Sequence, residues 1–397
     1  MATHSELRGL SGRLLERGEK ALRSLSEEEL VDGWSATVET YRDSSSAERR
    51  ALDPVLGPAA GLSPGCLSAS LEALLDGYRG EKSVRVIRRG RGFRASGSTL
   101  AILPSTVPGI ALQTMLHCLA LRQPLLVKAS TAQPYFAAAF RDSLAERLPA
   151  IAEGVAVATW TGGDPSVEEE LLSQWRTVVC YGTGATIDDL RQRIGERLVA
   201  FGPKASLAIV SDSRDGDSRA VADGLARDIC LFEQRGCLSL QAIYTEAAAA
   251  EELCASLAEA LERALQIWPP PFDSESSARR RQVRMTAELQ GLRVEPLAID
   301  AGNVLLDRQL AFQPSPGLRT VHVHPLEELE ELPRILEPHA GLLQAVSLSG
   351  RRAEALQPAL EALGVSRFAA PGELQSPPAD WRNDGVDLMR ALGSAVV

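Results

Sequence analysis

The stretch "STLAILPSTVPGIALQTMLHCLALRQPLLVKAS", residues 98–130, decides the fold class. A short apolar run ends at Pro104, a segment with apolar residues at helical spacing begins at Pro108, and a second apolar run ends at Lys128. Proline is favoured in the first turn of a helix, where its missing N–H would have no intrahelical partner. A strand, a helix and a second strand in this order are typical of a βαβ unit, whose two strands are parallel.

The same alternation of apolar runs and helical segments continues along the chain. Further strands are predicted at "VAVATWTGG" (155–163), "TVVCYGTG" (177–184) and "LQAIYTE" (240–246). This series predicts an α/β protein with a doubly wound parallel sheet and a second α/β unit. Ligands bind beyond the carboxyl ends of the strands in such folds, so the loops that follow the strands hold the candidate binding residues.

The composition of the 397 residues is that of an ordinary globular protein, with 45% apolar and 24% charged residues. A net charge of −10 argues against a general nucleic-acid binder, because phosphate neutralisation needs a concentrated basic surface. No apolar run reaches the ~20 residues that span a bilayer, and the polar N-terminus does not resemble a signal peptide. With six scattered cysteines that lack metal-ligand spacing, these features predict a reducing, cytoplasmic location.

Two other features are given simple structural interpretations. His322 and His324 share one face of a predicted strand, but no carboxylate or cysteine accompanies them nearby, so no metal site is expected. The arginine-rich segment "RVIRRGRGFR" (85–94) is interpreted as a solvated edge hairpin in preference to a contact for a phosphate of coenzyme A.

The segment "DICLFEQRGCLSLQAIYTE" (228–246) places a cysteine at the junction of a helix and a strand. The apolar spacing is helical before Gly236 and alternates as in a strand after Cys237. A nucleophilic thiolate needs a partly exposed, electropositive setting, which Arg235 could help to create. Buried cysteines that only fill a core are also common, so the spacing leaves both interpretations open. The sequence likewise leaves two interpretations of Lys128: a residue that contacts a ligand, or a surface lysine with no ligand.

Taken in order, "ILPSTVP", "LLVKAS", "YGTG", "FGPKAS" and "FEQRGC" resemble the motifs of the aldehyde dehydrogenase superfamily. Within it, "VAFGPKASLAIV" (199–210) and "PPADWRNDGVDLMRAL" (377–392) are similar to the acyl-CoA reductase branch, typified by the fatty-acid reductase of bacterial bioluminescence. The resemblance covers about residues 98–392. Residues 1–80, which match the family only loosely, are predicted to be a helical N-terminal segment from their apolar spacing. A cofactor-binding Rossmann-like domain (81–202), a catalytic domain (203–375) and a C-terminal segment (376–397) are expected to follow.

The resemblance also implies roles for individual residues. Cys237 would be the nucleophile, and Thr106 would donate a hydrogen bond to the oxyanion beside the backbone N–H of Cys237. If the alignment is shifted by one residue, Ser105 takes that role, and either residue could equally cap the next helix. The positions that match the family's cofactor-binding residues are Pro104, Ser105, Lys128, Ser130, Thr131, Gly162, Gly182, Thr183, Gly184 and Gly202.

One departure from the superfamily indicates the direction of the reaction. Oxidising aldehyde dehydrogenases carry a glutamate that activates water, whereas the matching position here, in "AFGPK", is Ala200. Alanine cannot act as a general base, so a thioester on Cys237 should persist until a hydride or another thiol reaches it. The resemblance therefore implies reduction of an acyl thioester to an aldehyde through a cysteine acyl-enzyme.

Thr131 bears on the choice between NADH and NADPH. NAD-preferring relatives have an acidic residue there, which accepts hydrogen bonds from the adenosine ribose hydroxyls. Without that carboxylate a 2′-phosphate can pair with Lys128 while Ser130 or Thr131 donates a hydrogen bond, so NADPH is favoured over NADH.

Two other functions fit the sequence. A CoA-acylating or other aldehyde dehydrogenase is compatible, because Ala200 argues only against hydrolysis. A redox-inactive acyl-binding or scaffold homologue is suggested by Thr106 and by the absence of the family's second glutamate from "QPSPGLRTV" (313–321). The expected substrate is an acyl-CoA or an acyl group on a carrier, and a partner protein could donate the acyl group. Because members of the superfamily are usually oligomers, a homo-oligomer is expected.

Overall fold

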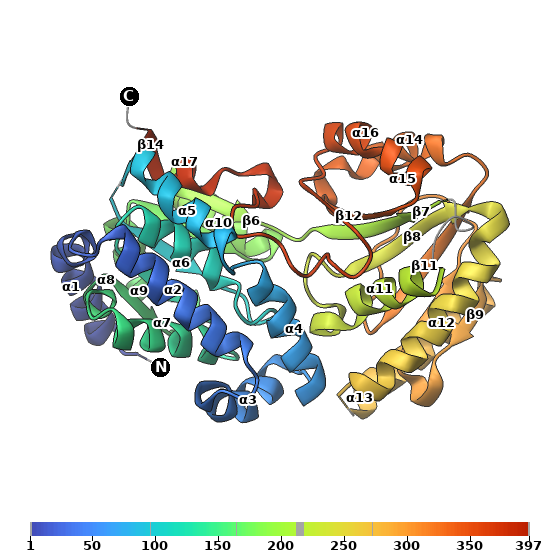
Figure 1. Ribbon diagram of the computed structural model, residues 1–397, viewed down its shortest axis with the longest axis horizontal. Coiled ribbons are helices and arrows are strands. Elements are labelled where there is room, and N and C mark those ends of the chain that lie inside the picture. Colours follow the sequence, from blue (N-terminus) through green and yellow to red (C-terminus); the bar gives the residue numbers. More distant parts are fainter. Residues whose placement is uncertain (1, 96, 164, 212–217, 272, 396–397) are drawn as a thin grey trace. The chain divides into compact units, whose positions relative to one another are not determined.

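A computed structural model describes residues 2–95, 97–163, 165–211, 218–271 and 273–395 (Figure 1). The chain divides into two compact units. The first unit contains residues 1–60, 74–203 and 378–397, and the second contains residues 61–73 and 204–377. The N-terminal and C-terminal segments thus both belong to the first unit, and the four-part division expected from the sequence stays a prediction.

The first unit is built on a five-stranded sheet in which every strand is parallel to its neighbours. The strand order is β4-β3-β2-β5-β6. The bounds are β2 Thr99–Ile102, β3 Leu125–Lys128, β4 Val155–Ala158, β5 Thr177–Tyr181 and β6 Leu198–Phe201. The βαβ unit predicted from residues 98–130 is therefore confirmed, with α6 (Ala111–Ala120) as its helix.

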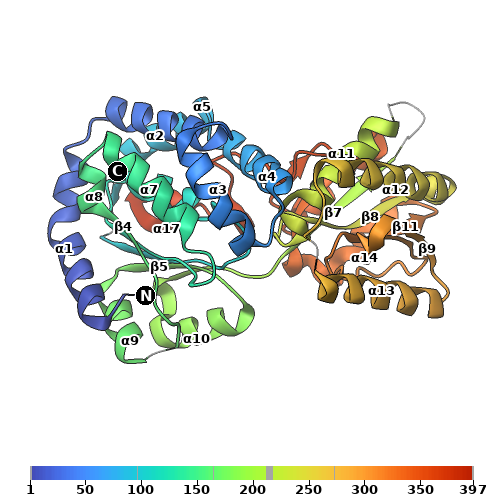
Figure 2. The ribbon, with the colours of Figure 1, turned by 90° about the horizontal axis from the view of Figure 1, so that it is seen from below.

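Helices cover both faces of this sheet, which explains why its strands are apolar throughout rather than alternating. Leu100, Leu126 and Val178 belong to a buried cluster with side chains of α1, α9 and α10. On the other face α6 contacts β2 and β3; Figure 2 shows α7 and α10 on opposite sides of the sheet. The helices of this unit are α1 His4–Arg23, α2 Glu27–Arg42, α3 Ala47–Ala60, α5 Glu81–Arg89, α7 Tyr135–Arg147, α8 Ala150–Gly154, α9 Pro165–Gln174, α10 Gly184–Ile194 and α17 Leu388–Leu392. Helix α4 (Pro64–Asp76) belongs to both units, because the division between them falls after residue 73.

The C-terminal segment packs against the arginine-rich segment of the first unit. Strand β1 (Phe93–Ala95) pairs antiparallel with β14 (Gly393–Ala395), and Arg89 forms an ion pair with Asp387. The hairpin expected for residues 85–94 is wrong, because residues 81–89 form helix α5. Val84, Val86 and Ile87 are buried in α5 while its arginines face outward or pair with acids, so helical amphipathicity outweighs the β-branched composition.

The second unit is built on a seven-stranded sheet of order β13-β12-β7-β8-β11-β10-β9, in which only β9 is antiparallel. Figure 1 shows α14–α16 on one side of this sheet and α11 and α12 on the other. The strands are β7 Ala205–Val210, β8 Leu240–Glu246, β9 Arg293–Pro296, β10 Asn303–Leu306, β11 Thr320–Leu326, β12 Leu343–Ser349 and β13 Arg367–Ala369. The helices are α11 Ser218–Cys230, α12 Ala250–Ile267, α13 Ser274–Leu289, α14 Leu332–Leu336, α15 Arg351–Ala355 and α16 Gln357–Ala362.

The two units together have the α/β architecture predicted from the sequence, with a doubly wound sheet in the first. Among the helices that the structure describes, none combines the length and the apolarity that crossing a membrane requires.

Candidate active site

The predicted cofactor residues of the first unit gather at one edge of its sheet. Because all five strands are parallel, their carboxyl ends meet there, with Ile102 opposite Lys128 and Lys128 opposite Ala158. The hydrogen bond from Gly182 N to Phe201 O, 3.1 Å, joins the ends of β5 and β6 in the same way. The structure therefore brings to this edge the loops that carry Pro104, Ser105, Thr106, Lys128, Ser130, Thr131, Gly162, Gly182, Thr183, Gly184 and Gly202.

Lys128 is the last residue of β3, and its side chain lies over the ring of Trp160, with Nζ 5.4 Å from the ring centroid. Burial lowers the pKa of the ammonium below its ordinary value, and the nearby carboxylate of Glu168 offsets only part of this shift. Glu168 itself accepts hydrogen bonds from Gly163 N (3.1 Å) and Arg193 (3.0 Å). Lys128 is thus a partly desolvated cation held at a strand end, with an anion as its neighbour.

The loop after β5 leads directly into a helix N-terminus. Thr183 is the N-cap of α10, and its hydroxyl accepts a hydrogen bond from Thr186 N. A Cβ on Gly182 would lie 3.3 Å from Cys180 Sγ, which leaves little room for a side chain there. Free backbone N–H groups and the helix dipole make such a terminus favourable for phosphate groups.

The turn after β2 positions Thr106 at the surface of the first unit. Gly109 in this turn has a φ of 87°, and a Cβ there would lie 2.5 Å from Leu74 Cδ2, so only glycine fits. Thr106 is exposed and Ser105 is half-buried. Both hydroxyls belong to the first unit and Cys237 to the second, so the oxyanion role of Thr106 or Ser105 stays a prediction.

Cys237 differs from the other cysteines in its exposure. Of the six cysteines, all within the described part of the chain, five are buried and Cys237 is partly exposed. Burial raises the pKa of the other five thiols to about 11 or 12, so they are not available as thiolates at neutral pH. Exposure therefore agrees with the choice of Cys237 as the nucleophile.

A tight loop holds Cys237 just before β8. The hydroxyl of Ser206 donates to Cys237 O at 2.7 Å, and Ser239 N donates to Gly236 O at 3.0 Å. Ser239 Oγ in turn accepts from Gly236 N at 3.2 Å. The backbone on both sides of the thiol is thus fixed by hydrogen bonds.

The turn that leads into this loop is strained. Phe232, Glu233 and Gln234 adopt left-handed φ angles of 54°, 52° and 58°. Each such non-glycine residue costs about 1–2 kcal/mol, and strain of this kind persists only where surrounding contacts determine the conformation. Contacts to this turn come from the amino end of β11, from Leu240 O at the start of β8 and from Ser70 of α4, whose Oγ accepts from Phe232 N at 2.9 Å.

Two buried side chains of the turn are held by residues at the start of β11. Glu233 accepts from Arg319 Nε at 3.0 Å in an ion pair whose side chains are 4% and 0% exposed. Gln234 accepts from Thr320 N at 3.1 Å and donates to Thr320 O at 2.8 Å and to Leu240 O at 2.7 Å. We call Glu233, Gln234 and Arg319 the nucleophile clamp. The sequence reasoning missed these residues; their only sequence signal is two polar side chains, Glu233 and Gln234, within an otherwise apolar run.

The histidine pair of β11 has a carboxylate beside it, which the sequence reasoning did not anticipate. Asp307 follows β10, and its Oδ2 lies 3.1 Å from His322 Nδ1. The expectation that no carboxylate lies near the histidines is therefore wrong, because parallel pairing of β10 with β11 brings together residues fifteen positions apart.

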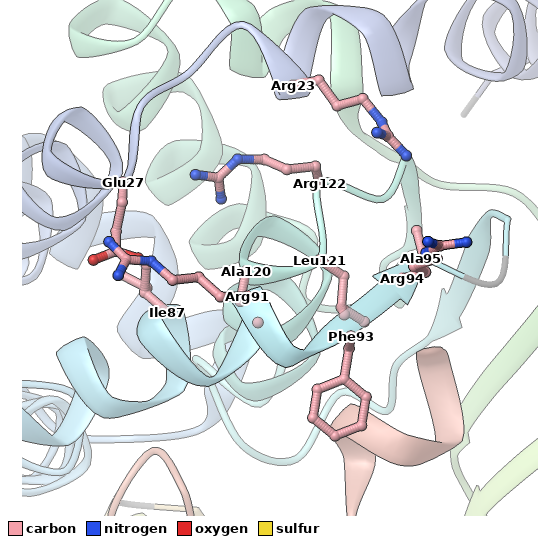
Figure 3. A pocket seen from close by; sticks show the side chains of 11 residues that line it. Arg23, Glu27, Ile87, Arg91, Phe93, Arg94, Ala95, Ala120, Leu121 and Arg122 are labelled. Carbon is pink, nitrogen blue, oxygen red and sulfur yellow. The ribbon is translucent and has the colours of Figure 1, made fainter. Parts of the chain in front are cut away.

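A pocket of about 340 Å³ lies in the first unit (Figure 3). The arginines that line it are Arg23 of α1, Arg91 in the turn after α5, Arg94 of β1 and Arg122 in the loop after α6. Arg91 pairs with Glu27 at 2.5 Å, and Arg122 donates to Leu119 O at 2.7 Å. These arginines are largely engaged within the protein itself, so the pocket does not identify a ligand.

Comparisons with known proteins give a consistent result. The acyl-CoA reductase (LuxC) family matches the chain over residues 73–394. The long-chain acyl-protein thioester reductase of Vibrio harveyi is 26% identical over 301 residues, which is 74% of this chain and 61% of that protein. The reductase of the same name from Photorhabdus luminescens is 25% identical over 242 residues, 59% of this chain and 50% of that protein. The chain therefore spans about half to three-fifths of the length of these curated relatives.

Solved structures with a similar fold include aldehyde dehydrogenases. Aldehyde dehydrogenase 21 from Physcomitrella patens has a TM-score of 0.75 at 12% identity, covering 100% of this chain and 90% of that one. A glyceraldehyde-3-phosphate dehydrogenase from Methanocaldococcus jannaschii, solved with NADP, has a TM-score of 0.71 at 12% identity, covering 99% and 93%. At these identities the comparison shows the fold, which is that of the aldehyde dehydrogenases.

Proposed function

Because the chain belongs to the acyl-CoA reductase (LuxC) family, we propose that it reduces an acyl thioester to an aldehyde through a thioester on Cys237. The observation that carries the proposal is the exposure of the six thiols: Cys237 is partly exposed, whereas the others are buried. It lies on a loop fixed by hydrogen bonds from Ser206 and Ser239, as a nucleophile requires.

The proposed chemistry begins when the Cys237 thiolate attacks the thioester carbonyl. A new C–S bond forms, the bond to the donor thiol breaks, and the departing thiolate takes up a proton. The acyl group then stays on Cys237, because Ala200 offers only a methyl group where a general base would stand. A bound reduced nicotinamide would supply a hydride to the acyl carbon of the Cys237 thioester, which would become a thiohemiacetal alkoxide. Breaking of its C–S bond would then release the aldehyde and restore the Cys237 thiolate.

The carboxyl edge of the first unit's sheet is the proposed cofactor site. Lys128, partly desolvated, offers a cation, and the N-terminus of α10 behind Gly182 offers backbone N–H groups. Both suit an anionic dinucleotide, and the loops with Pro104, Ser130, Thr131, Gly162 and Gly202 end at the same edge.

NADPH is the proposed form of the cofactor, on the argument from Thr131. The structure adds a second consideration, because Glu168 lies close enough to Lys128 to raise its pKa. A carboxylate near Lys128 opposes a 2′-phosphate, but Arg193 pairs with Glu168 at 3.0 Å and partly neutralises it. The preference for NADPH is therefore expected to be modest.

The proposed acyl donor is a long-chain acyl thioester carried by a protein or by coenzyme A. The named relatives are long-chain acyl-protein thioester reductases, which supports a protein-bound donor. An acyl-donating partner, a homo-oligomer and a cytoplasmic location remain predictions of the sequence.

Steady-state assays of aldehyde release test the proposal. With tetradecanoyl-CoA and NADPH, the native chain should form aldehyde, and Cys237→Ser should reduce the rate at least about a thousandfold, since serine is a far weaker nucleophile at neutral pH. Cys254→Ser, a buried cysteine of the same unit, should keep most of the activity. Equal activity in Cys237→Ser would disprove the role of Cys237.

A CoA-acylating aldehyde dehydrogenase is the second candidate. Ala200 argues against hydrolysis of the acyl-enzyme, and this is as compatible with transfer of the acyl group to CoA as with its reduction. It runs the same steps in reverse, from aldehyde, NADP and a free thiol. The rate of acyl-thioester reduction and the rate of aldehyde oxidation, measured at matched substrate concentrations, decide between the two candidates. A redox-inactive homologue would show neither rate.

A further inference from the structure

Two histidines and an aspartate meet on one face of the second unit's sheet. In the parallel pairing of β10 with β11, Leu305 lies opposite His322, so the pleat carries His322, His324 and Asp307 to the same face. Asp307 continues the ladder beyond β10, because its N–H donates to Val323 O at 2.9 Å. All three residues are at least nine-tenths buried, with exposures of 9%, 0% and 3%.

The spacing of these three side chains is close to that of metal ligands. One ring nitrogen of each histidine and one carboxylate oxygen of Asp307 lie within 4.8 Å of one another. The 3.1 Å between His322 Nδ1 and Asp307 Oδ2 is near the roughly 3.3 Å that separates two ligands about 2.0 Å from a tetrahedral zinc ion. To complete such a set, the ligand atoms of the cluster, which lie up to 4.8 Å apart, must move closer together.

His324 supplies the second, independent observation. Its Nδ1 lies 2.7 Å from Gln309 O, so this nitrogen carries the proton and donates it. Its Nε2 is buried and has no hydrogen-bond partner among the described residues. Burial of the ring lowers its pKa. A ligating histidine whose other nitrogen donates to a backbone carbonyl is the usual arrangement in metal sites.

Stacking limits the orientations that both rings can adopt before any ion binds. Tyr244 stacks on His324 with 4.8 Å between ring centroids, and the rings of His322 and His324 are within 8° of parallel. Fixed ligands lose little side-chain freedom on binding, which favours affinity.

We propose that Asp307, His322 and His324 bind one divalent transition-metal ion of the zinc type. Imidazole nitrogens with one carboxylate suit zinc and its neighbours, whereas magnesium and calcium require oxygen ligands. To bind the ion through Nδ1, His322 carries its proton on Nε2, and bonds from the ion to His322 Nδ1 and Asp307 Oδ2 replace the hydrogen bond between those two atoms. Water completes the coordination.

The ion has a structural role in this proposal. Cys237 precedes the amino end of β8, whereas Asp307 follows the carboxyl end of β10, and β8, β11 and β10 are parallel neighbours. The two sites therefore lie at opposite ends of the sheet. The ion joins the loop after β10 to β11, so its removal should lower thermal stability and leave acyl transfer to Cys237 unchanged.

Metal uptake by the full, tag-free chain tests the proposal. Cys237→Ser is used as the background, so that an exposed thiol cannot bind the ion. After treatment with EDTA, the protein is equilibrated with Zn²⁺, desalted and analysed for metal by mass spectrometry. We expect one ion per chain, an affinity at least about tenfold lower in Asp307→Asn and in His324→Gln, and no change in His339→Gln, a histidine of the same unit outside the cluster.

Cobalt gives a readout that does not depend on how the variants fold. Co²⁺ added to the same background protein should produce the visible bands of a four- or five-coordinate site with nitrogen ligands, and Zn²⁺ should displace them. Uptake of no ion by the background protein, or equal uptake in Asp307→Asn that retains its native circular dichroism, would overturn the proposal.

Discussion

The carboxyl edge of the first unit's sheet and the loop before β8 of the second unit hold the two halves of the proposed chemistry, and they are built in different ways. At the first, the candidate residues lie at or just after strand ends, such as Lys128 at the end of β3 and Gly182 after β5. At the second, Cys237 precedes its strand and depends on a strained turn that the nucleophile clamp holds.

The difference shows where stability and function are coupled. A strand end keeps its place as long as the sheet is intact, so its residues can change with little structural cost. The loop of Cys237 depends on long-range contacts, since Glu233 and Arg319 are eighty-six residues apart. Changes in the clamp should therefore affect both the fold of the second unit and the nucleophile, whereas changes at the first edge should affect cofactor binding alone.

The largest effect is expected from Arg319→Met. This change leaves the buried carboxylate of Glu233 without its partner, and breaking a buried pair in this way costs about 3–5 kcal/mol. Amide hydrogen exchange in peptides from β8 and β11 measures the loss. The double variant Glu233→Leu with Arg319→Met removes both charges and should recover most of it. A single variant as stable as the native chain would show that the ion pair does not hold the turn.

Lys128→Met should have a smaller effect, confined to the cofactor. Removing the cation at the end of β3 should raise the KM for NADPH at least about tenfold, equivalent to ~1.4 kcal/mol. Acyl loading of Cys237 and thermal stability should stay as in the native chain. Lys20→Met, an exposed lysine of α1, is the matched control. An unchanged KM in Lys128→Met would remove Lys128 from the proposed cofactor site.

A buried histidine of the first unit makes the stability of the protein depend on pH. In the first unit, burial lowers the pKa of His117 to about 4. The unfolded chain takes up a proton at this residue near pH 6.5 and the folded chain only near pH 4, so stability falls as the pH decreases from about 6.5 to 4, by at most ~1.4 kcal/mol per pH unit.

His117→Gln should remove that part of the slope, because glutamine does not titrate in this range. Urea unfolding of both proteins at several pH values between 6.5 and 4.5 measures the slopes. If the two proteins lose stability equally as the pH falls, His117 is not the group responsible.

The sequence predicted well the features that depend on local pattern. The apolar runs and helical spacing gave the parallel strands of the first unit, and the ordered motifs led to the family that the comparison over residues 73–394 confirms. The role of Cys237 as the nucleophile stays a prediction, which its partial exposure supports.

The missed features all depend on pairing between distant segments. The partner of Glu233 lies at the start of β11, and the partner of His322 lies after β10, so neither pair could be recognised without the strand order. Glu168 was missed beside Lys128 for the same reason, because α9 returns to the end of β3 only in the fold. Residues 85–94 were misread because their β-branched residues favour a strand, whereas the burial of Val84, Val86 and Ile87 on one side of a helix becomes evident only in the fold.

Intact-mass analysis of the chain with a long-chain acyl-CoA tests the central claim most directly. The account predicts a single acyl adduct that is absent from Cys237→Ala, persists over the course of the measurement without cofactor, and disappears with release of aldehyde when NADPH is added. An adduct that hydrolyses to the free acid without NADPH, or one that forms equally in Cys237→Ala, would contradict it.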